Sequence, residues 1–458
     1  MATTTAPKAS RTAPGVRQLV PGPFGPLARS RRDPLGFTLD CHRRFGDVFH
    51  LRFGPFLFHV VAHPDGVRHV LLDNQKNYPR SRFYDRTKVV LGEGLVTTEG
   101  APWRRQRRLA QPAFHHRRII ALADTMTRAI AAMLDSWRAP AESGTPIDVA
   151  AEFGRLTLRI VGRALGSIDL GDDTDRIGGA VTESLDFLDY WINNLVRVPF
   201  FVPTPRNLRA RRAIRTFDQV ISGILADRRR EPERDHGDLL SMLLEARDEE
   251  TGSAFSDREL RDQIVTFIGA GHETTAVALA WTFYLLSRHP DADARLRDEV
   301  ARVLGDRVPT ADDLPKLDCT RRVIEESLRI YPPVYATVRD AREDDEIGGF
   351  RIPARSIVIL CPYVTHRHPE FWPDPEAFDP DRFLPERSAD RPRFAWYPFL
   401  GGPHQCIGQE FAMMEATLAV AMVAQAYRLR LAPVAVVEPR PMVSLRPKNG
   451  VPMIVEPA

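Results

Sequence analysis

The chain has 458 residues, of which 43% are hydrophobic and 27% are charged, an ordinary globular composition with enough length for a large core. The net charge of only +3 argues against a nucleic-acid-binding protein. The four cysteines form no CxxC pair, which suits a reducing compartment better than a disulfide framework. They are Cys41, Cys319, Cys361 and Cys406.

Residues 1–30 are rich in Thr, Ala, Pro and Arg. The repeated prolines predict a flexible N-terminal segment that precedes one large folded region over 31–458. This start contains no apolar run of about 18 residues, so we expect no membrane anchor. It also lacks the apolar centre of a signal peptide.

The first regular elements predict a small sheet with short helices. Residues 34–45 and 64–72 favour helices. The alternating runs 46–53 and 56–61 favour two strands joined by a Gly-Pro turn.

A basic helix is predicted to start near Pro102, since proline favours the first helical turn. Its four arginines, at positions 104, 105, 107 and 108, are by themselves typical of a solvated helix face. Trp103 and Arg107 are four residues apart and therefore share one face of the helix.

Residues 116–255 are mainly helical by their periodicity. Within them, 182–202 carries many aromatic and apolar side chains, which more often form core than a ligand site. The mixed charges of 228–235, together with a proline, predict a solvated loop.

A long helix is predicted from the capping box Ser256–Glu259 to about Arg288, and Pro290 ends it. At 1.5 Å per residue it would span about 48 Å. Its middle reads Ala270-Gly271-His272-Glu273-Thr274-Thr275. Glycine and a Glu-Thr pair cost stability in an apolar helix and therefore indicate function. The alternative is a tolerated glycine beside a solvent-facing glutamate.

The next helix is predicted over 312–328 and brings Glu326 and Arg329 three residues apart, a spacing that is ordinarily a surface ion pair. Strands are expected over 334–339 and 356–360.

Cys406 lies near the end of a loop that begins at Phe399 and contains Gly401, Gly402 and Pro403. Good helix formers follow from residue 409, so the cysteine lies near a helix N-terminus, where thiolate is favoured. A thiolate is a nucleophile or a soft metal ligand. The alternative is a buried structural cysteine.

The spacing Phe399-x-x-Gly402-x-His404-x-Cys406-x-Gly408 resembles the haem-binding signature of the cytochromes P450, with His404 where that family carries Arg or His. The resemblance implies a mainly α fold with small β-sheets, in which 31–458 is a single catalytic domain. It also implies haem b, held between the long helix and the cysteine loop, with the thiolate of Cys406 as the axial ligand of the iron.

The long helix resembles the oxygen-activating helix of the same family. The resemblance implies that Ala270 and Gly271 contact the cofactor and leave room for oxygen, and that Glu273 and Thr274 relay protons. Trp103 resembles one half of a Trp-x-x-x-Arg pair that holds a haem propionate.

Arg107 completes that pair, and Arg339 and His404 match further propionate donors. The other arginines beside Trp103 would then face outward and attract an acidic electron donor.

Glu326 and Arg329 match the family's Glu-x-x-Arg motif. Together with Arg382, which stands in Pro-Asp-Arg-Phe, they are expected to form a buried charge cluster that supports folding and haem retention. The pocket lining is expected from 80–97, 185–201, 266–274, 334–338 and 442–445.

The implied function is a monooxygenase that hydroxylates a hydrophobic small molecule with one atom of O2. Terpenoids, fatty acids, steroids and polyketides all remain open. The 52 residues after Cys406 leave no room for a fused flavin or iron–sulfur domain. Electrons would therefore come from a separate ferredoxin or flavodoxin with its reductase. The resemblance also implies a cytoplasmic monomer of the soluble bacterial kind.

Three alternatives remain open. A peroxide-driven member of the family would carry an Arg–Pro pair where this chain has Glu273-Thr274. A non-catalytic haem sensor would not need that pair. A cysteine-nucleophile hydrolase would use Cys406 with His404 as base, although no orienting partner is evident.

Overall fold

The computed structural model describes residues 11–16, 26–166, 173–193, 198–230 and 237–458. Its contacts divide the chain into two compact units, each assembled from three segments. Unit 1 comprises Met1–Arg82, Val334–Ala377 and Asp390–Cys406. Unit 2 comprises Phe83–Pro333, Phe378–Ala389 and Ile407–Ala458.

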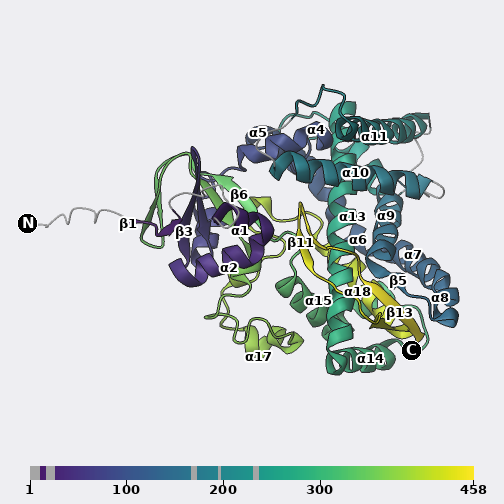
Figure 1. The fold of residues 1–458 in the computed structure, drawn as a ribbon. Helices are drawn as coiled ribbons and strands as arrows, with labels where there is room; N and C mark the ends of the chain where they lie inside the picture. Colours follow the sequence, from purple (N-terminus) through teal and green to yellow (C-terminus); the bar gives the residue numbers. More distant parts are fainter. Residues whose placement is uncertain (1–10, 17–25, 167–172, 194–197, 231–236) are drawn as a thin grey trace, which may run out of the picture. The chain divides into compact units, whose positions relative to one another are not determined.

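Helices dominate the described chain (Figure 1). The α-helices are α1 (Pro26–Arg32), α2 (Pro34–Phe45), α3 (Pro64–Arg68), α4 (Lys88–Leu91), α5 (Gly100–Ala110), α6 (His116–Ile120), α7 (Ala123–Ser136), α8 (Arg138–Ser143), α9 (Val149–Gly166), α10 (Asp173–Asn193), α11 (Pro205–Arg230), α12 (Leu239–Glu245), α13 (Asp257–Arg288), α14 (Pro290–Leu304), α15 (Asp318–Ile330), α16 (Pro362–Thr365), α17 (Pro385–Ser388) and α18 (Gln409–Ala426). Shorter 3-10 or π turns are η1 (His69–Asp73), η2 (Arg82–Thr87), η3 (Gln111–Phe114), η4 (Ala311–Lys316), η5 (Pro380–Phe383), η6 (Arg393–Ala395) and η7 (Gly402–His404).

The strands form four small sheets. They are β1 (Arg11–Thr12), β2 (Gly15–Val16), β3 (Val48–Phe53), β4 (Phe56–Val61), β5 (Ile147–Asp148), β6 (Thr337–Asp340), β7 (Asp345–Ile347), β8 (Phe350–Ile352), β9 (Ile357–Leu360), β10 (Tyr427–Leu431), β11 (Pro439–Pro441), β12 (Leu445–Pro447) and β13 (Pro452–Pro457). The predicted fold class, mainly α with small β-sheets, is confirmed.

Unit 1 is built on the five-stranded sheet β2-β3-β4-β9-β6. The hairpin of β3 and β4 is antiparallel with His50 opposite His59, and β4 pairs in parallel with β9. The predicted helix over 34–45 and both predicted strands are confirmed. The helix expected over 64–72 divides into α3 and the π turn η1.

The described parts of the N-terminal segment, 11–16 and 26–30, contain regular structure. β1 pairs with β8 and β2 pairs with β3, and α1 begins at Pro26. The ring Nδ1 of His50 lies 2.8 Å from the carbonyl oxygen of Ala13. Composition alone did not predict these strands, because pairing with distant strand edges leaves no local sequence signal. Residues 1–10 and 17–25 lie outside the described residues.

Unit 2 is organised around α13, the long helix that runs through it in Figure 1. The predicted capping box is present: Ser256 and Glu259 bond each other's backbone N–H groups. α13 packs along α9, where the rings of Phe153 and Phe283 stack at 5.3 Å. Burial on most of its circumference makes this helix the core of the unit.

Two local predictions in unit 2 are wrong. Arg228 does not lie in a solvated loop: it is in the last turn of α11, and its buried guanidinium pairs with Asp238 and donates to Ser241. The helix expected over 312–328 is broken, because Pro315 lacks the N–H that an α-helix would need. Among the described helices, none combines the length and hydropathy of a membrane span.

Candidate active site

Backbone hydrogen bonds close the loop that carries Cys406. Its N–H donates to the carbonyl of Phe399 at 3.0 Å. Leu400 and Gly402 have φ values of +60° and +65°, in the left-handed region. A Cβ atom at Gly402 would lie 1.9 Å from the carbonyl oxygen of Leu71. Packing within unit 1 therefore requires glycine at position 402. This requirement is independent of the cofactor contact that is predicted for Gly402.

Cys406 differs from the other cysteines in its exposure. Its side chain is exposed, whereas Cys41 and Cys361 are buried and Cys319 is half-buried. Burial raises the pKa of Cys41 and of Cys361 to about 11, and it also raises the pKa of Cys319. These three are therefore thiols at neutral pH, and Cys406 is the cysteine that a ligand can reach.

The neighbours of Cys406 in the predicted signature are also placed. Phe399 and His404 are partly exposed, and His404 closes the short turn η7. Gly408 caps α18, and a Cβ there would come no closer than 4.0 Å to the Phe114 ring. No side chain of the described chain therefore crowds this glycine.

Arg339, on β6 of unit 1, is a buried guanidinium with neutral partners. Its side chain donates to Thr337 Oγ1 and to the Val338 carbonyl, both at 3.0 Å. Only 2% of the residue is exposed. Among the described residues, no carboxylate pairs with it. A buried cation without an anion is costly, so this position favours an anionic ligand.

The middle of α13 has one accessible strip. Ala270 is exposed and Gly269, Gly271 and Thr274 are partly exposed, while the residues on either side are buried. The hydroxyl of Thr274 donates to the carbonyl oxygen of Ala270 at 2.7 Å. A Cβ at Gly271 would lie 3.1 Å from the side chain of Val161 on α9. Small residues therefore keep this strip of the helix open and let α9 pack closely.

Glu273 is held by the C-terminal segment of unit 2. Its Oε1 accepts a hydrogen bond from Ser444 Oγ at 2.6 Å and forms an ion pair with Arg446. The residue is only 7% exposed. The alternative of a solvent-facing glutamate is therefore wrong. Sequence reasoning missed Arg446, and found Ser444 only within the pocket range 442–445, because these partners lie more than 170 residues from Glu273 along the chain.

Trp103 and Arg107 lie on one face of α5, as predicted, with Trp103 buried and Arg107 half-buried. Their arginine neighbours do not all face outward. Arg105 pairs with Glu259 at 2.7 Å and Arg108 with Asp248 at 2.9 Å. The expected outward basic face is therefore wrong for these two, because their long side chains reach carboxylates of the same unit.

The buried cluster of Glu326, Arg329 and Arg382 is assembled as predicted. Arg329 donates to both oxygens of Glu326, at 2.7 and 2.8 Å. Arg382 Nε lies 3.4 Å from Oε1 of the same carboxylate. The Asp379 N–H also donates to that oxygen, at 2.9 Å.

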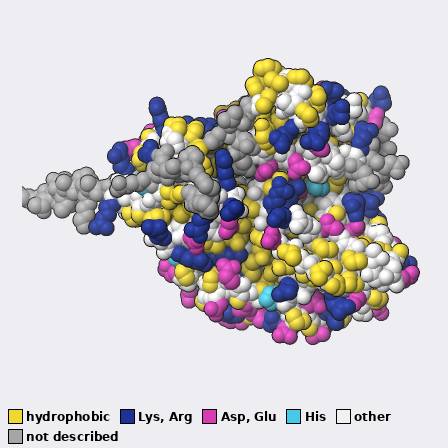
Figure 2. Space-filling model, viewed as in Figure 1, with side chains coloured by type: hydrophobic (Ala, Val, Ile, Leu, Met, Phe, Trp, Pro, Cys, Tyr) yellow, Lys and Arg dark blue, Asp and Glu magenta, His cyan; other side chains and the backbone are white. Residues whose placement is uncertain are grey.

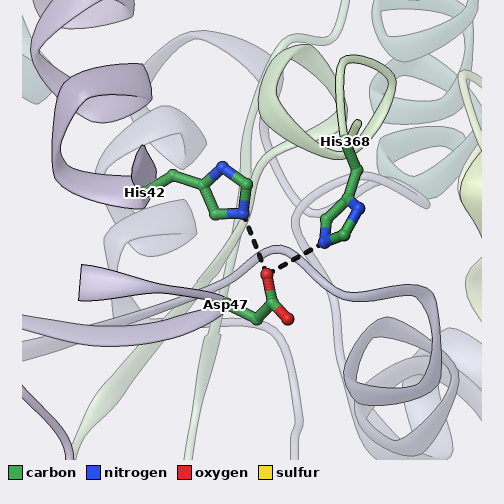
Figure 3. Close-up of side chains that lie close together, drawn as sticks. All are labelled: His42, Asp47 and His368. Carbon is green, nitrogen blue, oxygen red and sulfur yellow. Dashed lines mark hydrogen bonds and ion pairs between the residues drawn. The ribbon is translucent and has the colours of Figure 1, made fainter. Parts of the chain in front are cut away.

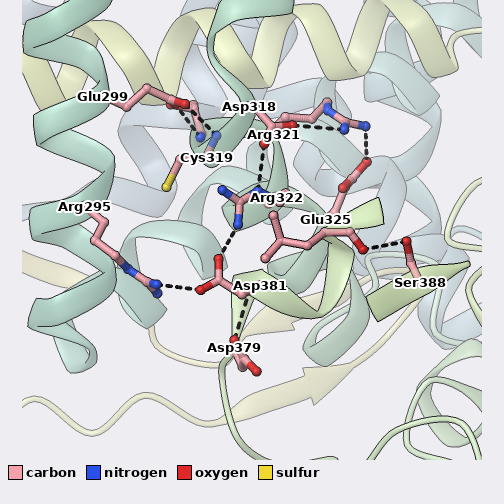
Figure 4. Close-up of polar contacts among 12 residues, drawn as sticks. Arg295, Glu299, Asp318, Cys319, Arg321, Arg322, Glu325, Asp379, Asp381 and Ser388 are labelled. Atoms are coloured by element: carbon pink, nitrogen blue, oxygen red, sulfur yellow. Dashed lines mark hydrogen bonds and ion pairs between the residues drawn. The ribbon is translucent and has the colours of Figure 1, made fainter. Parts of the chain in front are cut away.

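Around this cluster, more ion pairs tie α14, α15 and η5 together (Figure 4). Asp381 lies between Arg295, at 2.6 Å, and Arg322. Within α15, the half-exposed Arg321 pairs with the buried Glu325 at 2.9 Å. Many ion pairs therefore join the segments around Glu326, Arg329 and Arg382, which are predicted to support the site.

A cavity of about 410 Å³ opens in unit 2 between α10, α11 and β11. Its lining includes Phe187, Tyr190 and Met442, together with charged side chains such as Arg206 and Arg440. Two stretches predicted to line the pocket, 185–201 and 442–445, meet here.

Comparison with known proteins gives a consistent result. Residues 22–452 match the family model described as Cytochrome P450. The chain is 40% identical to cyclooctatin synthase of Streptomyces melanosporofaciens, over 90% of this chain and 89% of the relative. It is 37% identical to cyclooctat-9-en-7-ol 5-monooxygenase of that organism, over 93% and 91% of the two chains. Pentalenene oxygenase of Streptomyces avermitilis is also 37% identical, over 93% of each chain.

A solved structure supports the same assignment of fold. The heme domain of cytochrome P450DA superimposes with a TM-score of 0.86 at 26% sequence identity. The match covers 98% of each chain.

Proposed function

The chain belongs to the cytochrome P450 family of monooxygenases, and on that premise we propose that Cys406 is the thiolate ligand of a haem b at which a hydrophobic substrate is hydroxylated. The observation that carries this assignment is the exposure of Cys406, beside three cysteines whose burial keeps them protonated. When bound, haem with a thiolate ligand activates O2 and supplies the oxidising chemistry.

The residues of the chain fit this cofactor. Cys406 offers a soft sulfur ligand, and the buried guanidinium of Arg339 offers a charged donor to a carboxylate. We propose that Arg339, His404, Trp103 and Arg107 bind the two propionates.

Replacing Arg339 by leucine tests the role of the buried cation. We expect haem to bind about 10- to 100-fold more weakly, because a hydrogen bond to a charged group contributes about 1.5–3 kcal/mol. The haem-free variant should be no less stable than the haem-free parent, since leucine removes an uncompensated buried charge. Haem transfer to apomyoglobin measures the first quantity and urea unfolding the second. The exposed Arg342, changed to leucine, is the control; equal haem loss in both variants would contradict the assignment.

We propose that Thr274 positions protons for oxygen activation and that Glu273 supports it. The Thr274 hydroxyl donates its hydrogen to the Ala270 carbonyl at the accessible strip. Its oxygen can therefore accept a hydrogen bond from a proton donor that enters there. Ser444 and Arg446 fix the carboxylate of Glu273 and hold it ready as an acceptor. The Glu273-Thr274 pair also supports use of O2 rather than peroxide.

Changing Thr274 to alanine should uncouple electron consumption from product formation. We expect product per electron pair to fall by about 100-fold or more, since a positioned proton donor contributes about 10²–10⁴-fold. Thr282 is the matched control, because it lies on the same helix and bonds the Ala278 carbonyl at 2.8 Å in the same manner. Product and peroxide are quantified per NADH oxidised, and equal coupling in both variants would refute the role of Thr274.

For the substrate we propose a terpenoid-like olefin or alcohol. The names of two relatives specify an olefinic alcohol, cyclooctat-9-en-7-ol, and pentalenene. Apolar surface is also available: Figure 2 shows apolar side chains gathered at the end of unit 2 where α10 and α11 lie. Phe201 is 78% exposed there, with Val198 and Leu208 also exposed. Such a surface suits entry of a molecule that leaves water.

We further propose that electrons come from a separate ferredoxin or flavodoxin with its reductase, and that the protein works as a cytoplasmic monomer with 31–458 as its catalytic domain. The experiment that tests the function supplies NADH, a surrogate ferredoxin and its reductase together with a panel of cyclic olefins. Incorporation of one atom from isotopically labelled O2 into product is expected. Haem-bound protein that yields no labelled product with any donor would favour the haem sensor instead.

A further inference from the structure

A second cluster of metal-ligand side chains lies in unit 1, among residues that the proposed haem chemistry does not use. His42 lies in the last turn of α2, Asp47 precedes β3, and His368 follows α16. Figure 3 shows the two imidazoles converging on one carboxylate. The Nε2 atoms of His42 and His368 each lie 2.9 Å from Oδ1 of Asp47.

We propose that His42, Asp47 and His368 form a binding site for a divalent transition-metal ion of the zinc class. The three ligand atoms all lie within 4.8 Å of one another. In a tetrahedral zinc site with bonds of about 2.0–2.1 Å, neighbouring ligand atoms stand about 3.3 Å apart. Each 2.9 Å contact therefore needs to open by only a few tenths of an ångström. Two imidazoles and one carboxylate are also the donor set that zinc accepts.

The fold holds these ligands in place without the ion. The Gly46 N–H closes α2 on the carbonyl of His42 at 2.8 Å. The Asp47 carbonyl accepts from the Ala62 N–H at 2.9 Å. The His368 carbonyl accepts from the Trp372 N–H at 3.0 Å. Because backbone bonds hold the segments that carry all three residues, little backbone entropy remains to be lost when an ion binds.

Burial and charge also suit a cation. The side chains of His42 and His368 are 11% and 7% exposed, whereas that of Asp47 is 40% exposed. The two imidazole hydrogen bonds hold the pKa of Asp47 well below its usual range, so the carboxylate is ionised. Its exposed side gives the ion a path from solvent and leaves room for a water as the fourth ligand.

Without metal, the cluster is a hydrogen-bonded link, and binding must displace that arrangement. His368 Nδ1 accepts the N–H of Glu370 at 3.3 Å, so its hydrogen is on Nε2 and points at Asp47. A metal on Nε2 moves that hydrogen to Nδ1, with no net release of a proton from the neutral ring. The bond from Glu370 is then lost, and its length indicates that this costs little. His63 packs its ring edge against His368, at 5.6 Å between centroids, and keeps the ring in place.

Zinc binding to the haem-loaded protein tests the proposal. We expect calorimetric titration to give one Zn²⁺ per chain and a rise in the unfolding temperature, and we expect neither from Mg²⁺, which prefers oxygen ligands. Loss of an outer-shell partner alone weakens metal binding by at least about 10-fold. His42→Gln and His368→Gln each remove a direct ligand, so each should weaken Zn²⁺ binding by more than about 10-fold. His116→Gln is the control, because His116 also pairs with a carboxylate, Glu410 at 3.0 Å, but no third ligand joins this pair among the residues that the structure describes.

The same Zn²⁺ affinity in the parent and in both cluster variants would overturn the proposal. If a variant fails to fold, the unchanged protein still tests the proposal by crystallography. Crystals grown with Zn²⁺ should show an anomalous peak at the zinc edge within bonding distance of Oδ1 of Asp47. Peaks elsewhere and none there would also overturn it.

Discussion

Changing Cys406 to serine is expected to abolish the strongly red-shifted Soret band that thiolate-ligated haem shows when it is reduced and bound to carbon monoxide. Serine keeps the size of the side chain but removes the soft sulfur that, as a thiolate ligand, would push electron density toward a bound haem iron. Loss of an outer-shell partner of a metal ligand lowers activity by about 10- to 100-fold. Loss of the ligand itself should lower monooxygenase turnover by more than that. The difference spectrum of the dithionite-reduced protein, with and without carbon monoxide, measures the ligand directly.

Cys361 provides the matched control for this substitution. It also lies in unit 1, but it is buried and its Sγ contacts the carbonyl oxygen of Tyr335 at 3.2 Å. Serine at that position can keep the contact, so Cys361→Ser should retain the red-shifted band.

Three outcomes separate the alternatives for Cys406. An unchanged band in Cys406→Ser would refute the ligand assignment. A parent band at the position of histidine-ligated haem would point to another ligand. A parent protein that takes up no haem would return the cysteine-nucleophile hydrolase, with His404 as base, to consideration.

The parts of the molecule that the sequence predicted well are those with local causes. The capping box of Ser256 and Glu259 and the shared face of Trp103 and Arg107 each depend on residues three or four apart. Such spacings bring side chains together whenever the helix forms. The open strip around Gly271 was expected from the family resemblance instead.

The parts that could not be predicted depend on contacts across the chain. Nothing near Glu273 indicates that Arg446 pairs with it, and nothing near Arg108 indicates Asp248. Gly402 shows the same limit: its requirement for glycine comes from the backbone of Leu71, far away in sequence. A motif therefore identifies which residues do chemistry, while their electrostatic partners are set by tertiary packing.

Replacing Glu326 by glutamine should produce the largest loss of stability among single changes in the charge cluster. The carboxylate is fully buried and receives hydrogen bonds from Arg329 and from the Asp379 backbone, with Arg382 at 3.4 Å. Glutamine keeps the shape but removes the negative charge that both guanidiniums contact. Removing one partner of a buried ion pair costs about 3–5 kcal/mol, a large share of the about 5–15 kcal/mol by which native proteins are stable.

The control for Glu326 is a carboxylate in an exposed ion pair. Asp135 pairs with Arg138 at 2.7 Å, and the two side chains are 66% and 73% exposed. Asp135→Asn should therefore cost only about 0.2–1 kcal/mol. Urea unfolding followed by tryptophan fluorescence gives the free energy of unfolding, and the Soret band reports haem retention in the same samples. Equal losses in the two variants would show that the buried cluster contributes no more than a surface pair. A large loss in Glu326→Gln alone would show that the fold depends on this one carboxylate to neutralise two buried cations.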